Sequence, residues 1–179
     1  MLSGTHIHLR ALEPYDIDLM YQWENDRSVW PVSGTLVPFS RHTMEQFVKM
    51  SHQDIYTNKQ LRLAIDKKMN TEESKNTVGY IDLYDFDPSH RRAGVGILIG
   101  SLESRRKGMA LESLQLLSDY AFKVLHLHQL YCHIHVNNLA SIRLFSAAGF
   151  VCTGELKDWT LINGSWVNVF VMQKVYPIN

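Results

Sequence analysis

Three consecutive cationic residues, Arg105, Arg106 and Lys107, follow an apolar run in this 179-residue chain and precede an amphipathic segment that starts near Gly108. The first amides of a helix have no intrahelical acceptor, and the helix dipole attracts anions and repels cations at that end. Cations at a helix start are therefore unfavourable unless an anion neutralises them. Glycine also lets the backbone approach a phosphate closely. The turn predicts a phosphate or pyrophosphate site, with a solvated basic helix start as the alternative.

Hydrophobic periodicity predicts the elements that must position this turn. Strands are expected over residues 7–12, 61–66, 77–84, 93–99, 129–136, 155–162 and 166–175. Helices are expected after Pro14, over 43–50, over about 108–125, and from Asn137 or Asn138 to Gly149. The order is strand, two helices, three strands, helix, strand, helix and two strands. It indicates an α/β sandwich of mixed sheet and helices.

Local signals refine this outline. The 108–125 helix should bury a single stripe, made of Ala110, Leu114, Leu117, Ala121 and Val124. The polar stretch from Lys67 to Asn76 should form an exposed turn, and Asn163-Gly164 is typical of a tight hairpin. A left-handed Gly149 should end its helix, with Phe150 packing back over it.

Composition limits the class of protein. Eighteen basic residues balance eighteen acidic ones, so no global field favours a nucleic-acid or membrane partner. The length fits a single domain over residues 1–179. The N-terminus does not resemble a signal peptide, no apolar run is long enough to span a membrane, and Cys132 and Cys152 are the only cysteines. A cytoplasmic protein with reduced thiols is expected.

Two motifs carry a family resemblance. Arg105-x-x-Gly108-x-Ala110 opens the long helix, and Asn138-x-x-Ser141-x-x-x-Phe145-x-x-x-Gly149-Phe150 follows later in the chain. Together they resemble the coenzyme A signature and the second conserved helix of the GCN5-related N-acetyltransferase (GNAT) superfamily. Within it, the run from His90 to Ala93, the stretch Asp119 to Phe122 and the segment from Gly154 to Gly164 are most similar to the bacterial spermidine and ribosomal-protein-alanine acetyltransferases.

The resemblance implies acetyl-coenzyme A as co-substrate and no metal. Carried over residue by residue, it implies three groups of cofactor contacts: the strand Ile97, Leu98 and Ile99; the turn Arg105, Arg106, Lys107, Gly108, Met109 and Ala110; and Asn138 with Ser141. The strand backbone would bind the pantetheine arm and polarise the thioester carbonyl, and the turn amides would hold the pyrophosphate. Helix capping by Asn138 is compatible with a cofactor contact.

The implied fold is the GNAT type: α/β (α+β), with a mixed, mainly antiparallel central sheet and helices on both faces. The implied activity is transfer of an acetyl group to a primary amine, with a polyamine and a protein or peptide amino terminus as leading acceptors. Members of the family often form dimers or larger rings, so a homo-oligomer is also implied.

Two departures from the family pattern concern catalysis. The spermidine enzymes have a tyrosine, the acid, where this chain has Phe145, and a glutamate where it has Gly94. Either the enzyme relies on positioning and solvent, or other side chains substitute. Asp82 and Tyr84 are predicted to lie across a hairpin from residues 94–96, although Tyr84 is also a natural packing residue. The alternative function is a non-catalytic acyl-coenzyme A-binding or sensor protein, with a nucleotide-binding protein third.

The predicted acceptor wall, residues 26–56, is not strongly acidic. Three cations offset its three carboxylates, and two histidines lie nearby. The carboxylates are Asp26, Glu45 and Asp54, the cations are Arg27, Arg41 and Lys49, and the histidines are His42 and His52. Overall resemblance favours a polyamine, whereas this local charge does not.

Three rival signals carry less weight. His133 and His135 share one strand face and could form part of a metal site, but no carboxylate or cysteine pattern completes a ligand set. Cys132 is expected to be a core residue rather than a nucleophile. The tryptophans have separate expectations: Trp23 in the core, Trp30 near the substrate, and Trp159 and Trp166 in a cross-strand pair or a subunit contact.

Overall fold

Eight strands form one sheet in the computed structural model, which describes residues 2–68 and 76–176. The strands are β1 (Leu2–Ser3), β2 (Ile7–Ala11), β3 (Leu61–Lys67), β4 (Thr77–Asp87), β5 (Arg92–Ile99), β6 (Gln129–His135), β7 (Val151–Ile162) and β8 (Ser165–Val175). Their spatial order is β1-β2-β3-β4-β5-β6-β8-β7. The β5–β6 pair is parallel and the other described pairs are antiparallel. The expected mixed, mainly antiparallel sheet is confirmed.

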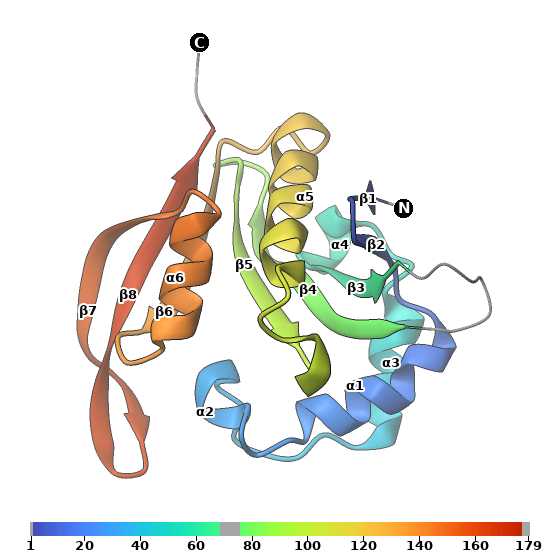
Figure 1. Cartoon of the computed structure of the whole chain (residues 1–179), viewed down its shortest axis with the longest axis horizontal. Helices are drawn as coiled ribbons and strands as arrows, with labels where there is room; N and C mark the ends of the chain where they lie inside the picture. Colours follow the sequence, from blue (N-terminus) through green and yellow to red (C-terminus); the bar gives the residue numbers. More distant parts are fainter. Residues whose placement is uncertain (1, 69–75, 177–179) are drawn as a thin grey trace.

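Helices cover both faces of this sheet, as expected (Figure 1). They are α1 (Ile17–Glu24), α2 (Trp30–Ser33), α3 (Arg41–Met50), α4 (Ile55–Asn58), α5 (Met109–Lys123) and α6 (Leu139–Ala147), with short 3-10 turns at Pro14–Asp16 and Leu102–Ser104. Three short elements were not expected from the sequence, namely β1, α2 and α4. Helix α3 begins two residues before the predicted start because the Ser40 hydroxyl accepts a hydrogen bond from the Thr43 amide and caps it.

Alternating side chains give the sheet two separate cores. In β3, Leu63 and Ile65 join the larger cluster beneath α5 and α6, whereas Ala64 joins the smaller cluster beneath α1 and α3. The smaller cluster also holds Met20 and Trp23 of α1 and Tyr80 of β4. This alternation fixes which side chains of β4, β5 and β6 face each side of the sheet.

Helix α5 buries a stripe that differs from the predicted one at its ends. Leu114, Leu117 and Ala121 are buried as expected, but Val124 is exposed and Ala110 is only partly buried. Val124 lies just beyond the last residue of the helix, so the helical spacing no longer fixes its direction. The buried face is instead completed by Met109 and Phe122 and by two serines, Ser113 and Ser118.

The turn predictions have mixed outcomes. Asn163 and Gly164 adopt φ values of 49° and 80° and join β7 to β8, which confirms the hairpin. Gly149 has a φ of 89°, and the Phe150 ring packs against Phe145 with centroids 5.0 Å apart, as expected. Residues 69–75 of the predicted 67–76 turn lie outside the described residues. Helix-length apolar segments able to cross a membrane are absent from the described part of the chain.

Candidate active site

Strands β5 and β6 separate part-way along their length. They pair only from Arg92 opposite Gln129 to Gly94 opposite Tyr131, while β6 stays paired with β8 along its whole length. Beyond Gly94 the strands diverge around a hollow of about 130 Å³. This groove, named the cofactor groove below, is lined by Val32, Val95, Gly96, Ile97, Cys132, His133, Ile134, His135, Asn138, Ser141 and Phe145.

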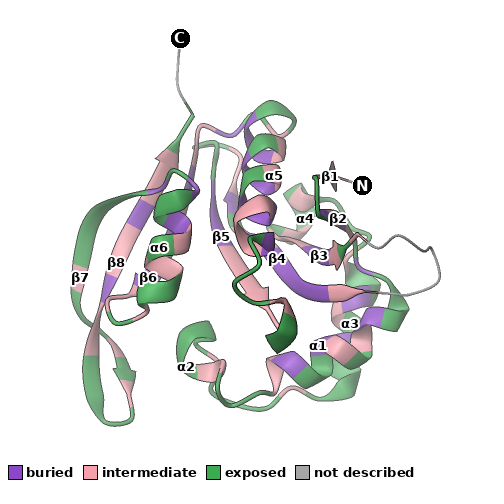
Figure 2. Cartoon of the chain, viewed as in Figure 1, coloured by how far each residue is buried: buried purple, intermediate pink, exposed green. Residues whose placement is uncertain are grey.

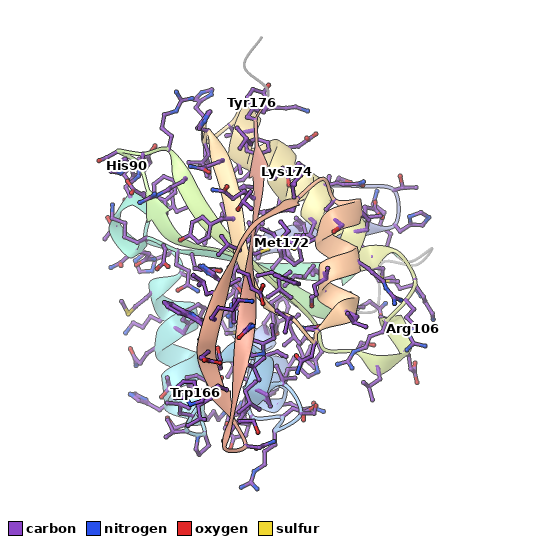
Figure 3. All side chains as sticks on the ribbon, turned by 90° about the vertical axis from the view of Figure 1, so that its left-hand side faces the viewer. His90, Arg106, Trp166, Met172, Lys174 and Tyr176 are labelled. Atoms are coloured by element: carbon purple, nitrogen blue, oxygen red, sulfur yellow. The ribbon has the colours of Figure 1, made fainter. Side chains whose placement is uncertain are left out.

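The turn from Arg105 to Ala110 has the geometry of an anion site. No acceptor is found within the described chain for the backbone amides of residues 106–111, at and just before the first turn of α5. Gly108 is the left-handed N-cap residue, with a φ of 79°, and a side-chain carbon at that position would meet nothing within 4 Å. Arg106 extends from this turn at the edge of the molecule (Figure 3). Free amides, open space and cations therefore coincide here.

The predicted cofactor residues fall into two places. Ile97, Asn138 and Ser141 all line the cofactor groove, and the Asn138 carboxamide oxygen caps α6 by accepting from the Ser141 amide at 3.2 Å. The residues of the turn lie at the start of α5 instead. Arg105 is held there because its Nε donates to the Ile99 carbonyl at 3.0 Å, whereas the Met109 side chain is buried in the core. Leu98 packs against the smaller core, on the opposite side of the sheet from the core that Ile97 contacts.

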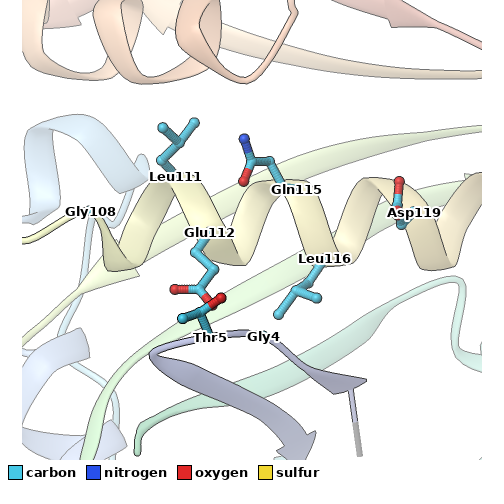
Figure 4. A pocket seen from close by; sticks show the side chains of 8 residues that line it. All are labelled: Gly4, Thr5, Gly108, Leu111, Glu112, Gln115, Leu116 and Asp119. Atoms are coloured by element: carbon cyan, nitrogen blue, oxygen red, sulfur yellow. The ribbon is translucent and has the colours of Figure 1, made fainter.

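A shallow depression beside α5 shows where an anion is disfavoured (Figure 4). The Glu112 carboxylate lies in it, where Oε1 accepts from the His6 amide at 2.9 Å and Oε2 lies 3.0 Å from His6 Nδ1. Burial raises the pKa of Glu112, but the hydrogen bonds from His6 outweigh it and hold the pKa below its ordinary range. This carboxylate anchors the N-terminal strands to α5 and repels phosphate on that side of the helix.

A second and larger hollow of about 490 Å³ lies on the α1–α3 side of the sheet. It is named the acceptor cavity below, and its size falls within the ordinary range for small-molecule sites. Its wall is mostly apolar, with contributions from Met20, Val29, Phe39, Met44 and Phe47. It shares five lining residues with the cofactor groove: Val32, Val95, Gly96, Ile97 and His133. The two hollows therefore meet at the point where β5 and β6 diverge.

An ion triad forms the polar part of the acceptor cavity. The Arg62 guanidinium donates to Glu24 Oε1 at 2.5 Å and to Asp82 Oδ1 at 2.6 Å, and all three residues line the cavity. Burial lowers the pKa of Arg62, but Asp82 and then Glu24 more than compensate and raise it above its ordinary value. Two carboxylates against one guanidinium leave this wall with one net negative charge.

The predicted acceptor-wall segment, residues 26–56, lines this cavity with Val29, Phe39 and Phe47 but not with its carboxylates. Asp26, Glu45 and Asp54 do not line the acceptor cavity; Asp54 instead caps α4 through the Thr57 amide. Glu24 was missed although the sequence carries its signal. It lies four residues after buried Met20, so it shares the inward face of α1.

Tyr84 occupies the space that a side chain at position 94 would need. The strand register pairs Tyr84 with Gly94 and Asp82 with Gly96, as predicted. A carbon added at Gly94 would lie 2.3 Å from the Tyr84 ring. Burial raises the pKa of Tyr84, so its phenol stays protonated at neutral pH and can donate but not accept a proton. The family glutamate is thus replaced by an aromatic ring packed over glycine.

Burial and the surrounding side chains test the expectations for Phe145, Cys132 and the two groove histidines. Phe145 is buried against Phe150 and lines the cofactor groove with a side chain that has no polar atom. Cys132 is buried as expected, and this burial raises its pKa to about 12, so it carries no thiolate at neutral pH. His133 and His135 both line the groove, but the described residues contain no group of three or more metal-ligating side chains.

The tryptophan expected in the core is confirmed, whereas Trp30 lines neither the acceptor cavity nor the cofactor groove. Trp23 is buried in the core beside Tyr80, and Trp30 opens α2 with its indole nitrogen donating to the Glu24 carbonyl at 2.9 Å. Trp159 and Trp166 are not directly opposite each other, because the register places Leu161 across from Trp166. Both rings are exposed on the β7–β8 hairpin, most of whose outer strand is also exposed (Figure 2).

Comparison with known proteins identifies the family of this chain. The family model for an acetyltransferase (GNAT) domain matches residues 6–151, which include both hollows' sheet strands and the basic turn. The chain belongs to the GNAT family of acetyltransferases. Its activity is the acetyl-coenzyme A-dependent acetylation of an amine, and the expected GNAT-type fold is confirmed.

Several relatives share almost the whole length of the chain. The spermidine N(1)-acetyltransferase of Vibrio cholerae is 27% identical over 97% of this chain and 96% of its own. A probable N-acetyltransferase of Bacillus subtilis, YjcK, is 28% identical over 99% and 98%. A crystal structure of the V. cholerae enzyme with coenzyme A and spermine superposes with a TM-score of 0.84, at 27% identity and 96% coverage of each chain.

Proposed function

We propose that this GNAT enzyme acetylates a primary amine of a polyamine in the acceptor cavity. The observation that carries the proposal is the cavity wall itself, in which aromatic rings surround the net negative triad of Glu24, Arg62 and Asp82. A polyamine has cationic amines joined by apolar methylene groups, and such a wall offers both a negative charge and apolar surface. The V. cholerae relative, whose structure holds spermine, supports the same class of acceptor.

An amino-terminal peptide is the second candidate. The observation in its favour is Arg62, since a guanidinium can bind a peptide carbonyl or carboxylate that a polyamine lacks. Arg62 is nevertheless saturated by two carboxylates at 2.5 and 2.6 Å, which leaves the polyamine as the better match.

The acceptor class is tested by thiol release from acetyl-coenzyme A with spermidine, spermine, putrescine and a short amino-terminal peptide. We expect kcat/KM to be highest for the polyamines. Asp82→Asn removes one negative charge from the wall but preserves its shape, and it should raise the KM for spermidine by roughly tenfold, equivalent to about 1.4 kcal/mol. The matched control is Asp26→Asn, outside the cavity, which should leave the KM unchanged. A higher kcat/KM for the peptide than for all polyamines would reject the proposal.

We further propose that coenzyme A binds with its pyrophosphate on the amides of residues 106–110 and its pantetheine arm in the cofactor groove. The free first-turn amides, the cations of Arg105, Arg106 and Lys107, and the open backbone at Gly108 support the first contact. Ile97, Leu98 and Ile99 would present backbone to the arm from the diverging strand, while Asn138 and Ser141 contact it from α6. Met109 and Ala110 contribute amides rather than side chains.

Gly108→Val is expected to weaken coenzyme A binding by at least about tenfold, because the branched side chain fills the space above the free amides. It also places a β-branched residue at a φ of 79°, which costs about 1–2 kcal/mol of stability. Gly164→Val is the matched control: it has a φ of 80°, equally open surroundings, and lies on the distant β7–β8 hairpin. Calorimetric titration of both variants should show lost affinity only for Gly108→Val. Equal affinities would place the pyrophosphate elsewhere.

Self-association is also proposed. The V. cholerae relative has a structure described as dodecameric, which matches 96% of this chain with a TM-score of 0.76. In this chain, Trp159, Leu161 and Trp166 expose large apolar side chains together on the β7–β8 hairpin. Exposed large apolar side chains grouped in this way are typical of association surfaces, and a second copy of the chain would cover them.

A further inference from the structure

His133 stands at the junction of the two hollows. It lies on β6, two residues beyond the last position that pairs with β5, and it lines both the cofactor groove and the acceptor cavity. Among the side chains that line both hollows, it is the only one that can take up or release a proton: Val32, Val95 and Ile97 are aliphatic, and Gly96 has none. An acetyl group delivered from the groove to an amine in the cavity must pass this point.

Three other polar side chains near the junction are unsuited to accept a proton, and His135 lines the cofactor groove but not the acceptor cavity. Asp82 is held by two hydrogen bonds from Arg62, at 2.6 and 3.2 Å. Burial keeps the phenol of Tyr84 and the thiol of Cys132 protonated, because it raises the pKa of both groups. Gly94 and Phe145 contribute no polar side-chain atom. By contrast, neither ring nitrogen of His133 has a hydrogen-bond partner within the described chain.

An aromatic row positions the imidazole from one side. The Tyr84 ring packs edge-on against Tyr131 with centroids 6.1 Å apart, and Tyr131 packs in turn against the His133 ring at 5.7 Å. The Tyr131 hydroxyl is directed to Asp85 at 3.5 Å rather than to the imidazole. These contacts restrict the ring orientation and leave its nitrogens free to face the junction.

We propose that His133 is the catalytic base that removes a proton from the acceptor ammonium group. This assignment rests on the proposed acetyl transfer to an amine. An unprotonated ring nitrogen takes one proton from the ammonium, directly or through a water molecule, and later releases it to solvent. The freed amine lone pair forms a C–N bond with the thioester carbonyl carbon. The C–S bond then breaks, the thiolate leaves with its electron pair, and it takes the second proton from the new amide nitrogen.

The test is steady-state acetylation of spermidine by His133→Asn. We expect kcat to fall by about 10²–10⁴-fold, the usual contribution of a general base. Coenzyme A affinity and the thermal unfolding midpoint should change little, since the side chain is exposed and makes no hydrogen bond to the described chain. His126→Asn is the matched control. His126 is exposed in the loop before β6, and its φ of 53° suits asparagine, so this variant should keep wild-type activity.

A second variant separates chemistry from packing. His133→Ala should recover part of its lost kcat when free imidazole is added, because the small base can enter the open junction. If the wild-type enzyme is active and the kcat of His133→Asn lies within about tenfold of the wild-type value, the assignment of His133 as the base is overturned. The proposed acetyl transfer to an amine would still stand. Loss of kcat without any imidazole rescue, together with lost coenzyme A affinity, would also overturn it. Failure of the wild-type enzyme to acetylate any amine would reject both proposals.

Discussion

Replacing Gly96 with valine is expected to lower kcat/KM for acetyl transfer by about 10²-fold, because displacement of reacting groups by an ångström has effects of that size. Gly96 lines both hollows and is paired with Asp82 on β4. A carbon added there would lie 3.8 Å from the Tyr84 ring and 3.9 Å from Asp82, which are ordinary contacts. The first carbon therefore fits, and the two methyl groups extend into the space where amine and thioester must meet.

The effect should be confined to catalysis. Valine is favoured in strands, so the free energy of unfolding of Gly96→Val should equal or exceed that of the wild type. Gly154→Val is the control, since Gly154 lies on exposed β7 with nothing within 4 Å of an added carbon. Comparison of kcat/KM with urea unfolding for both variants tests the prediction. Full activity in Gly96→Val would mean that the reaction takes place away from the junction.

Replacing Arg10 with methionine is expected to destabilise the fold by about 3–5 kcal/mol, the range for a buried ion pair that loses one partner. Arg10 donates to Asp16 at 2.7 and 2.8 Å, to Asp66 at 2.6 and 3.2 Å, and to Thr77 at 3.0 Å. Asp16 is fully buried. The hydrogen bonds to Asp16 raise the pKa of Arg10 most, Asp66 raises it further, and together they outweigh the lowering by burial. Without the guanidinium, a buried carboxylate is left without a counter-charge.

Arg41→Met supplies the contrast for this prediction. Arg41 also contacts two carboxylates, Asp18 at 2.5 Å and Glu45 at 3.6 Å, but all three side chains are largely exposed. Solvent screening should therefore limit its loss to about 0–1 kcal/mol. Urea unfolding at neutral pH measures both variants. Equal losses for Arg10→Met and Arg41→Met would show that burial does not govern the strength of these networks.

Much of the architecture follows from local sequence patterns. Strands β5 and β6, helix α5 and the Asn163-Gly164 hairpin carry complete local signals, because hydrophobic period and turn chemistry specify them without distant partners. The turn from Arg105 to Ala110 belongs to the same group. Gly108 and the preceding cations are adjacent in sequence, so the free amides of α5 could be placed before the structure was known.

The acceptor side could not be predicted in the same way. Glu24, Arg62 and Asp82 come from three elements and meet only because α1 crosses the face of β3 and β4. The role of His133 depends equally on tertiary structure, since the sequence does not show where β5 and β6 stop pairing. Local periodicity identifies which face a residue occupies, whereas the partners across that face are set by packing.

Transfer of label from radiolabelled acetyl-coenzyme A to spermidine by the wild-type enzyme tests the central claim most directly. The joined hollows predict that the label appears in acetylated spermidine, with release of one free thiol for each acetyl group transferred. A protein that binds coenzyme A tightly, yet leaves the label on the thioester with spermidine, spermine and putrescine alike, would contradict polyamine acetylation. That result would support the sensor alternative suggested by Gly94 and Phe145.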